Sequence, residues 1–306
     1  MWFKQVQLFQ LTTPIKHSTQ VLIERLEPLE FRACMPSMPS SSGWVSPLEE
    51  ENAALVRTLN GCHMICLQIE EKILPASVIN QTLKDKVKLL EATEGRKIRG
   101  KEKLSFKDEV VHTLLPRAFT KLSRLYAYID TKNGWLVLNT NSAAKAELFL
   151  SMFKKSLGDV TAGLELVKPS AVLTSWLKDH NYPKLFSIEK SCVLQDINQQ
   201  NRVIRCQQQD LFVPGIQALV KDGCEAIQLG LCWQDRLSFV LAGDFTLRSI
   251  KRTEDDLAEI AEITESKSQR LDADFFMMTE MLSGLLTDLL EVFLAKNVVA
   301  KLAKTG

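Results

Sequence analysis

The sequence lacks the features of several large protein classes. It contains no run of the roughly 18 apolar residues that a membrane-spanning helix needs, since its most apolar stretch, 284–295, is interrupted by Asp288 and Glu291. The first ten residues, MWFKQVQLFQ, have neither an apolar signal core nor a small-residue cleavage site. A Gly-rich loop ending in Lys and then Ser or Thr, as in nucleotide-hydrolysing motors, is also missing. We therefore expect a cytoplasmic protein without a membrane partner.

Residue patterns that bind metals or catalyse reactions are equally scarce. Only four histidines are present, and none falls in a His-Glu-x-x-His motif. Cys62, His63 and Cys66 lie close together, but no second Cys or His pair follows at zinc spacing, so we interpret them as part of a buried strand. The seven cysteines are an odd number and lie mostly in apolar runs, which indicates reduced thiols. The sequence predicts no metal and no cofactor.

Two acidic motifs keep one enzymatic alternative open. Glu70 and Glu71 precede Lys72, and Asp272 and Asp274 flank an alanine; these are the best candidates for a metal-dependent nuclease. Two-metal chemistry needs several carboxylates that converge on the ions, and short motifs of this kind arise by chance in most chains. We therefore expect a protein that is not an enzyme, with a nuclease as the least favoured alternative.

What the chain does have is a strong separation of charge. Its net charge is only +1, from 38 basic and 37 acidic residues. Residues 72–124 nevertheless hold thirteen Lys or Arg against six Asp or Glu, whereas residues 254–280 hold two against nine. Nucleic-acid binding depends on the local potential, so the basic segment can bind phosphates even in a nearly neutral protein. The alternative is that both segments are solvated surfaces without a ligand.

The basic segment is predicted to form a protruding helical hairpin, or finger, over residues 75–116. Pro75 opens a helical pattern, Gly95 and Gly100 interrupt it, and Ser105 followed by Asp108 resembles the capping box of a second helix. Each helix has a single apolar stripe, formed by Ile79, Leu83, Val87 and Leu90 in the first and by Phe106, Val110 and Leu114 in the second. The basic turn then lies at the tip of the finger.

The remaining sequence predicts an α+β fold, because its strands are grouped in hairpins that form antiparallel sheets with flanking helices. Residues 1–74 combine a first strand, a helix that Ser18 can cap, an irregular loop at Cys34–Trp44 and a strand in GCHMICLQIEEK. Residues 117–170 contain a β-hairpin turning at Asn133 and Gly134, followed by a helix. Residues 171–306 are β-rich and end in a helix that begins at Asp274, with an apolar stripe of Phe275, Met278, Leu282, Leu285 and Leu289 on one side.

The basic side chains that could reach phosphates lie on the finger and just beyond it. No zinc finger, RRM signature or helix-turn-helix is present to read bases, so DNA binding would be directed to the backbone and independent of sequence. The candidate residues for binding duplex DNA are Lys84, Lys88, Arg96, Lys97, Arg99, Lys101, Lys103, Arg117, Lys121 and Arg124.

Several long segments of the chain resemble one bacterial family. MWFKQVQLFQL, EEKILP, KDEVVHTLLPRAF, YIDTKNG, KKSLG, RVIRCQQQDL and RLDADFFMMTEM follow one another in the order found in the recombination-associated RdgC proteins. The resemblance implies a homodimer that closes head-to-head and tail-to-tail into a ring around duplex DNA. It also implies DNA binding without sequence preference, restraint of RecA-mediated recombination, no catalysis and a location at the nucleoid in the cytoplasm.

The resemblance also assigns positions outside the basic residues. Phe119 matches an aromatic near the contact that closes the ring, although an ordinary core position is an alternative. RVIRCQQQDL departs from the family pattern, which usually has Lys or Arg where this chain has Gln207 and Gln208. We expect an interface segment at Gln208 and Gln209, held by amide hydrogen bonds. The acidic segment 254–280 would face outward or pack at a subunit contact.

The favoured function is therefore that of a ring-shaped homodimer on duplex DNA. The alternative from another class is a structural interaction protein whose main partner is a recombination protein and for which DNA is secondary. Binding to DNA alone would separate the two.

Overall fold

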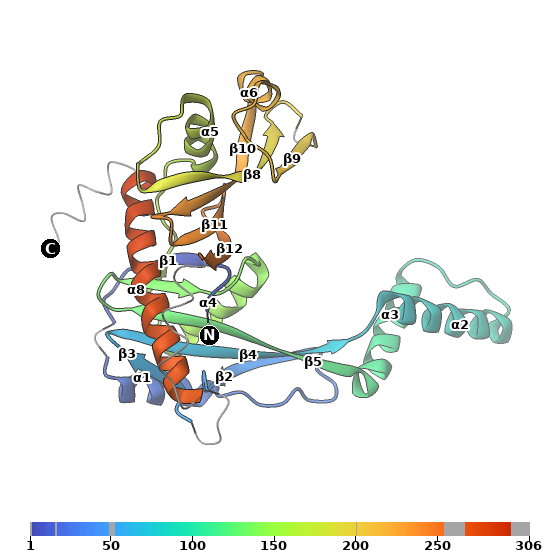
Figure 1. The fold of residues 1–306 in the computed structure, drawn as a ribbon. Coiled ribbons are helices and arrows are strands. Elements are labelled where there is room, and N and C mark those ends of the chain that lie inside the picture. Colours follow the sequence, from blue (N-terminus) through green and yellow to red (C-terminus); the bar gives the residue numbers. More distant parts are fainter. Residues whose placement is uncertain (1, 16, 49–52, 200, 254–266, 295–306) are drawn as a thin grey trace.

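Two antiparallel sheets with helices packed around them form the architecture, which confirms the predicted α+β class (Figure 1). The computed structural model describes residues 2–15, 17–48, 53–199, 201–253 and 267–294. The larger sheet has seven strands in the order β2-β4-β5-β6-β1-β7, with β3 also paired to β4. Its strands are β1 (Gln7–Leu11), β2 (Ser40–Val45), β3 (Val56–Leu59), β4 (Cys62–Ile73), β5 (Phe119–Asp130), β6 (Trp135–Leu138) and β7 (Thr161–Ala162).

The larger sheet buries both of its faces because its central strands alternate between two cores. Ile65 and Leu67 of β4 face one core with α1 (Thr19–Leu26) and α4 (Ala143–Leu157). Met64 of β4 and Tyr128 of β5 face the other core, which they share with the smaller sheet. Successive residues of a strand point to opposite faces, so a 12-residue strand such as β4 can supply both cores.

The smaller sheet has five strands in the order β12-β11-β10-β8-β9. These strands are β8 (Phe186–Asp196), β9 (Val203–Gln207), β10 (Cys224–Trp233), β11 (Leu237–Ala242) and β12 (Leu247–Arg252). Its apolar residues share a core with α5 (Pro169–Asp179) and α6 (Pro214–Lys221). Val6, just before β1, exchanges backbone hydrogen bonds with Leu247 of β12, and this bridge joins the two sheets.

The long helix α8 (Lys267–Phe293) packs along both sheets (Figure 1). The predicted stripe of Phe275, Met278, Leu282, Leu285 and Leu289 is confirmed, since all five side chains are fully buried. Polar contacts tie the helix to both sheets: Arg57 of β3 binds Asp272, and Trp233 Nε1 of β10 donates to Asp288 Oδ2 at 2.7 Å. None of the described helices is long and apolar enough to cross a membrane.

Several sequence predictions of element boundaries were wrong. The loop predicted at Cys34–Trp44 is irregular only in its first half, because β2 begins at Ser40 and pairs with β4. The final helix begins at Lys267, before the predicted Asp274. Ser18 does cap α1, as predicted, by accepting a hydrogen bond from the backbone of Val21. The short elements β3, β7 and α6 were not predicted.

The acidic segment predicted at 254–280 is only partly described. Residues 254–266 lie outside the described residues. In the remaining part, Asp272 pairs with Arg57, and Glu280 Oε1 accepts a hydrogen bond from Asn60 Nδ2 at 2.8 Å. These two carboxylates therefore take part in contacts between α8 and the larger sheet.

Candidate nucleic-acid interface

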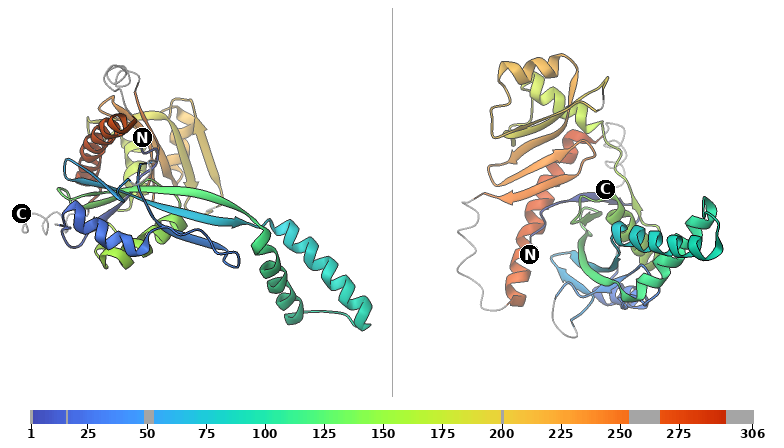
Figure 2. Two further views of the ribbon diagram at one scale, coloured as in Figure 1. Left: turned by 90° about the horizontal axis from the view of Figure 1, so that it is seen from below. Right: turned by 90° about the vertical axis from the view of Figure 1, so that its right-hand side faces the viewer.

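The basic segment lies on two helices that stand apart from the two-sheet body. α2 (Ala76–Glu94) follows β4, and α3 (Lys101–Leu114) precedes the short turn η2 (Leu115–Arg117) and β5. Figures 1 and 2 show this α2–α3 pair at the outer ends of β4 and β5, projecting away from the body. Each helix has one buried residue, Leu83 in α2 and Val110 in α3. The other side chains of the pair are exposed or partly exposed.

The two helices begin and end at residues that the sequence indicates, with one exception. α2 starts after Pro75, and Gly95 ends it in a left-handed conformation at φ 67°. α3 starts after Gly100, at φ 60°, so the predicted start at Ser105 was wrong. Ser105 and Asp108 lie inside the helix and form no capping box, because glycine already allows the sharp turn one helical turn earlier.

The loop between the helices, residues 95–100, is anchored by an isoleucine. Ile98 is only 5% exposed, and its backbone N–H donates to Glu91 Oε1 at 2.9 Å. Sequence reasoning missed both residues, although Ile98 is the single apolar residue in the run GRKIRGK. A single apolar residue in a basic loop could have predicted this anchor, because such a residue is expected where the loop packs back against the helices. The basic residues on either side of Ile98 are exposed, so this anchor fixes the middle of the loop and leaves their side chains in solvent.

Arg96 differs from the other basic residues of the loop because it already has anionic partners. Its guanidinium lies 2.7 Å from Glu94 and 2.5 Å from Glu102. The hydrogen bonds to Glu102 raise the pKa of Arg96, and the same hydrogen bonds lower the pKa of Glu102. A phosphate would have to compete with two carboxylates for this side chain. The role of Arg96 in binding DNA stays a prediction.

The remaining basic side chains of the α2–α3 pair are mostly available to a ligand. Lys86 is paired with Glu109 and lies over the Phe106 ring. In contrast, six of the predicted DNA-binding residues are exposed and make no ion pair with any described residue: Lys84, Lys88, Lys97, Arg99, Lys101 and Lys103. Few of the positive charges on the α2–α3 pair are therefore neutralised by ion pairs within the described residues.

Three further predicted residues continue the basic surface toward the body. Arg117 follows α3, and Lys121 and Arg124 lie on the outer half of β5. All three side chains are exposed, and Arg124 Nε donates to Gln68 Oε1 on β4 at 3.3 Å. The basic surface therefore extends from the α2–α3 pair along the β4–β5 ribbon.

An apolar patch lies on the same ribbon. Phe119 is 85% exposed, and it sits directly opposite Ile73 on β4, which is 48% exposed. Leu122, three residues further along β5, is 59% exposed, but its side chain points to the opposite face of the ribbon. The alternative that Phe119 is an ordinary core residue is therefore wrong. Its assignment to a subunit contact stays a prediction.

The two glutamines predicted at an interface lie in a different part of the molecule. Gln208 and Gln209 follow β9, the outermost strand of the smaller sheet, and both are exposed. The backbone N–H of Gln209 donates to Lys190 O at 3.4 Å, which continues the β8–β9 pairing. Within one chain the structure does not bring them together with Phe119, which belongs to the larger sheet.

The motifs considered for metal chemistry have structural roles. Glu70 Oε2 accepts a hydrogen bond from the backbone of Cys34 at 2.7 Å, and Asp272 is bound to Arg57. Cys62 lies in the buried strand β4, where burial raises the pKa of its thiol to about 12. His63 is also buried there and shares a hydrogen bond with Thr58. Among the described residues, no group of three or more His, Cys, Asp or Glu side chains could hold a metal ion.

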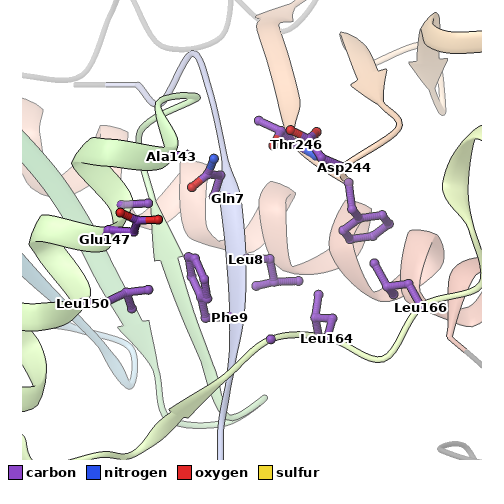
Figure 3. A pocket seen from close by; sticks show the side chains of 13 residues that line it. Gln7, Leu8, Phe9, Ala143, Glu147, Leu150, Leu164, Leu166, Asp244 and Thr246 are labelled. Carbon is purple, nitrogen blue, oxygen red and sulfur yellow. Dashed lines mark hydrogen bonds between the residues drawn. The ribbon is translucent and has the colours of Figure 1, made fainter. Parts of the chain in front are cut away.

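A separate cavity of about 330 Å³ lies where β1, α4 and the turn between β11 and β12 meet. Figure 3 shows Gln7 and Glu147 on one side of it, Asp244 and Thr246 on the other, and Leu8 between them. Two carboxylates at a mostly apolar cavity repel phosphate, so this cavity does not extend the basic surface.

Comparison with known proteins matches nearly the full chain to one family. The family model described as "Putative exonuclease, RdgC" matches residues 1–296. A relative from Yersinia pestis (strain Pestoides F), named "Recombination-associated protein RdgC", is 36% identical over 294 residues, which cover 95% of this chain and 97% of the relative. The protein of the same name from Yersinia enterocolitica serotype O:8 / biotype 1B is 37% identical over 295 residues, with the same coverage. The chain therefore belongs to the RdgC family, whose curated members are named for their association with recombination.

Proposed function

We propose that this protein binds duplex DNA without sequence preference, as a ring-shaped homodimer that restrains RecA-mediated recombination at the nucleoid. The observation that carries the proposal is the set of exposed lysines and arginines on the projecting α2–α3 pair that form no ion pair with any residue the structure describes. Lysine and arginine bind phosphates of any sequence by releasing counterions, and this term alone supplies non-specific affinity. The family name, which refers to recombination, is consistent with DNA as the ligand.

Support for a ring comes from the separation of the two predicted contact regions. The apolar patch at Phe119 and Ile73 lies at the outer end of the β4–β5 ribbon, whereas Gln208 and Gln209 lie at the edge of the smaller sheet. A dimer that closes head-to-head and tail-to-tail needs two separate self-complementary surfaces on each chain. An aromatic that is 85% exposed is a suitable anchor for one of them.

The test of the DNA-binding part compares unrelated duplexes of equal length over a series of salt concentrations. We expect similar affinities, and a decrease of log K with log salt of about 0.9 for each phosphate contact. A single sequence bound about a thousandfold more tightly than the others would contradict backbone-directed binding, because that ratio is the low end for specific binders.

The test of the assembly uses Phe119→Ser. We expect the variant to keep the melting temperature of the monomer fold and to open the ring at this contact, while the second contact still joins the two chains; small-angle scattering with and without DNA should show a more extended dimer. A variant whose scattering profile stays that of the closed dimer would remove Phe119 from the subunit contact. If the unmodified protein binds a recombination protein but no DNA, the alternative of a structural interaction protein is correct.

A further inference from the structure

Two cysteines face each other across the outermost pair of strands in the smaller sheet. Cys192 of β8 is paired directly with Cys206 of β9, and both thiols are free. Residues that lie opposite each other in an antiparallel pair have Cα atoms about 4.5–5.5 Å apart, which is within the range of disulfide-bonded cysteines. The two thiols also share a hydrogen bond. The strand register therefore already places the two sulfur atoms where a bond between them can form.

Strand register brings no other two cysteines of the described residues together. The remaining cysteines in strands face residues of other kinds on the adjoining strands, and they are Cys62, Cys66, Cys224 and Cys232. Cys34 lies outside the strands. A disulfide within the folded chain is therefore expected between Cys192 and Cys206 before any other pair.

A cavity of about 380 Å³ gives access to both cysteines. Its lining includes Cys192 and Cys206 together with the polar residues Ser191, Arg205, Gln207 and Ser249. Its volume is many times the roughly 30 Å³ that one water molecule occupies in the liquid. A small polar oxidant such as hydrogen peroxide can therefore reach the two thiols, although Cys192 is only 3% and Cys206 only 6% exposed.

We propose that Cys192 and Cys206 form a redox-modification site, at which a peroxide converts the two thiols into an intramolecular disulfide. In the first step the thiolate of Cys206, the more exposed of the two, attacks one peroxide oxygen. The O–O bond breaks, the sulfur is oxidised to a sulfenic acid, and the other oxygen leaves as water. In the second step the sulfur of Cys192 attacks the sulfenic sulfur, and its proton leaves with the displaced hydroxide as a second water. One peroxide thus accepts two electrons for each disulfide formed.

The order of the two steps follows from the surroundings of Cys192. Burial and the adjacent Cys206 thiol raise the pKa of Cys192 to about 12. The thiolate is the form that attacks a peroxide, so Cys192 is poorly suited to the first step. In the second step the sulfenic acid is held beside it, and no diffusing reagent has to be captured.

The disulfide would restrain an edge of the smaller sheet. β9 pairs only with β8 among the described strands, and Gln208 and Gln209 follow it directly. A covalent bond between the two strands limits the opening of β9 away from β8. Disulfides in reducing compartments are usually transient, and a thiol reductant would restore both cysteines. The inference does not depend on DNA binding or on a ring.

The test treats the full-length, folded protein with hydrogen peroxide, blocks the remaining thiols and digests the chain with trypsin without a reductant. Cleavage after Lys190, Arg202 and Arg205 separates the two cysteines, so only a disulfide can join peptides 191–202 and 206–221. We expect this linked pair in the mass spectrum, with two hydrogen atoms fewer than the separate peptides, and its loss after reduction. Amide hydrogen exchange in residues 203–207 should become at least about tenfold slower in the oxidised protein.

Matched variants separate this site from general oxidation. The double variant Cys224→Ser, Cys232→Ser removes two other cysteines of the same sheet and should still form the linked peptides. The double variant Cys192→Ser, Cys206→Ser should show no slower exchange in 203–207 after peroxide. A link to another cysteine, a disulfide between chains, or only sulfinic and sulfonic acids at Cys206 would overturn the site. A disulfide that leaves exchange in 203–207 unchanged would overturn the restraint on β9.

Discussion

The α2–α3 pair and the two-sheet body use the same kinds of residue in opposite ways. In the body, charged side chains tie layers together, as Arg57 and Asp272 do between β3 and α8, and large apolar residues are enclosed. In the α2–α3 pair, each helix has a single buried residue, and most lysines form no ion pair within the described part of the chain. Exposed charged side chains that form no ion pair within the fold are therefore a sign of a surface that binds a ligand.

The largest effect should come from removing a core aromatic of the body. Phe149 is fully buried on α4 and packs edge-on against Trp44 at 5.3 Å between ring centroids. Phe149→Ala should lower the free energy of unfolding by about 3–5 kcal/mol. Denaturant unfolding followed by circular dichroism measures this. Leu83→Ala in α2 is the matched comparison, and an equal loss for both would show that the helix pair unfolds together with the body.

A smaller loss of stability is expected where α8 passes close to the smaller sheet. A Cβ atom at Gly284 would lie only 3.0 Å from Cη2 of Trp233, whose indole is held by Asp288. Gly284→Val should therefore cost about 1–3 kcal/mol through overpacking. Gly215→Val in α6 is the control, because nothing lies within 4 Å of the Cβ position there. Thermal melts that do not separate the two variants would contradict this packing.

The basic loop should affect DNA binding and leave stability unchanged. Lys97→Glu, Arg99→Glu, Lys101→Glu removes three free charges and keeps Arg96 with its carboxylate partners. We expect affinity for DNA to fall at least about tenfold near physiological salt, with a flatter salt slope. The melting temperature should hardly change, because exposed substitutions usually shift stability by less than about 0.5 kcal/mol. If the affinity for DNA and its dependence on salt are both unchanged, the loop is a solvated surface that does not contact DNA.

The smallest effect concerns the anchor of that loop. Glu91→Gln and Glu91→Ala remove the same charge, but only glutamine can still accept the Ile98 N–H. We expect the glutamine variant to bind DNA about as tightly as the unmodified protein or slightly better, and the alanine variant to bind a few-fold more weakly than the glutamine variant. Hydrogen exchange at the Ile98 amide reports the anchor directly. Identical exchange in both variants would show that Glu91 does not hold the loop.

Local patterns in the sequence predicted most of the regular elements, because those patterns have local physical causes. The stripe on α8, the Ser18 cap and the strand at Cys62 followed directly from periodicity and capping chemistry. The basic candidates on α2 and α3 were found in the same way, from composition. None of these inferences required knowledge of which segments meet in space.

What the sequence could not supply were contacts between segments that meet only in the folded chain. The pairing of Arg96 with Glu102 depends on how the loop returns to α3, and composition alone ranked Arg96 with its free neighbours. The exposure of Phe119 depends on how far β4 and β5 extend beyond the body, because the same apolar residue would be buried in a shorter strand. From the sequence alone, Phe119 could be either a core residue or part of a subunit contact.

The pairing of β4 with β5 has a mechanical consequence. All twelve residue pairs, from Cys62 with Asp130 to Ile73 with Phe119, follow one register without a bulge, and neither strand contains glycine or proline. The ribbon is therefore a stiff arm that is fixed in the core at one end and has no hinge along its length. If two such chains enclose a duplex, the enclosure can open only when the two chains separate at a contact, because the arm itself can bend only slightly.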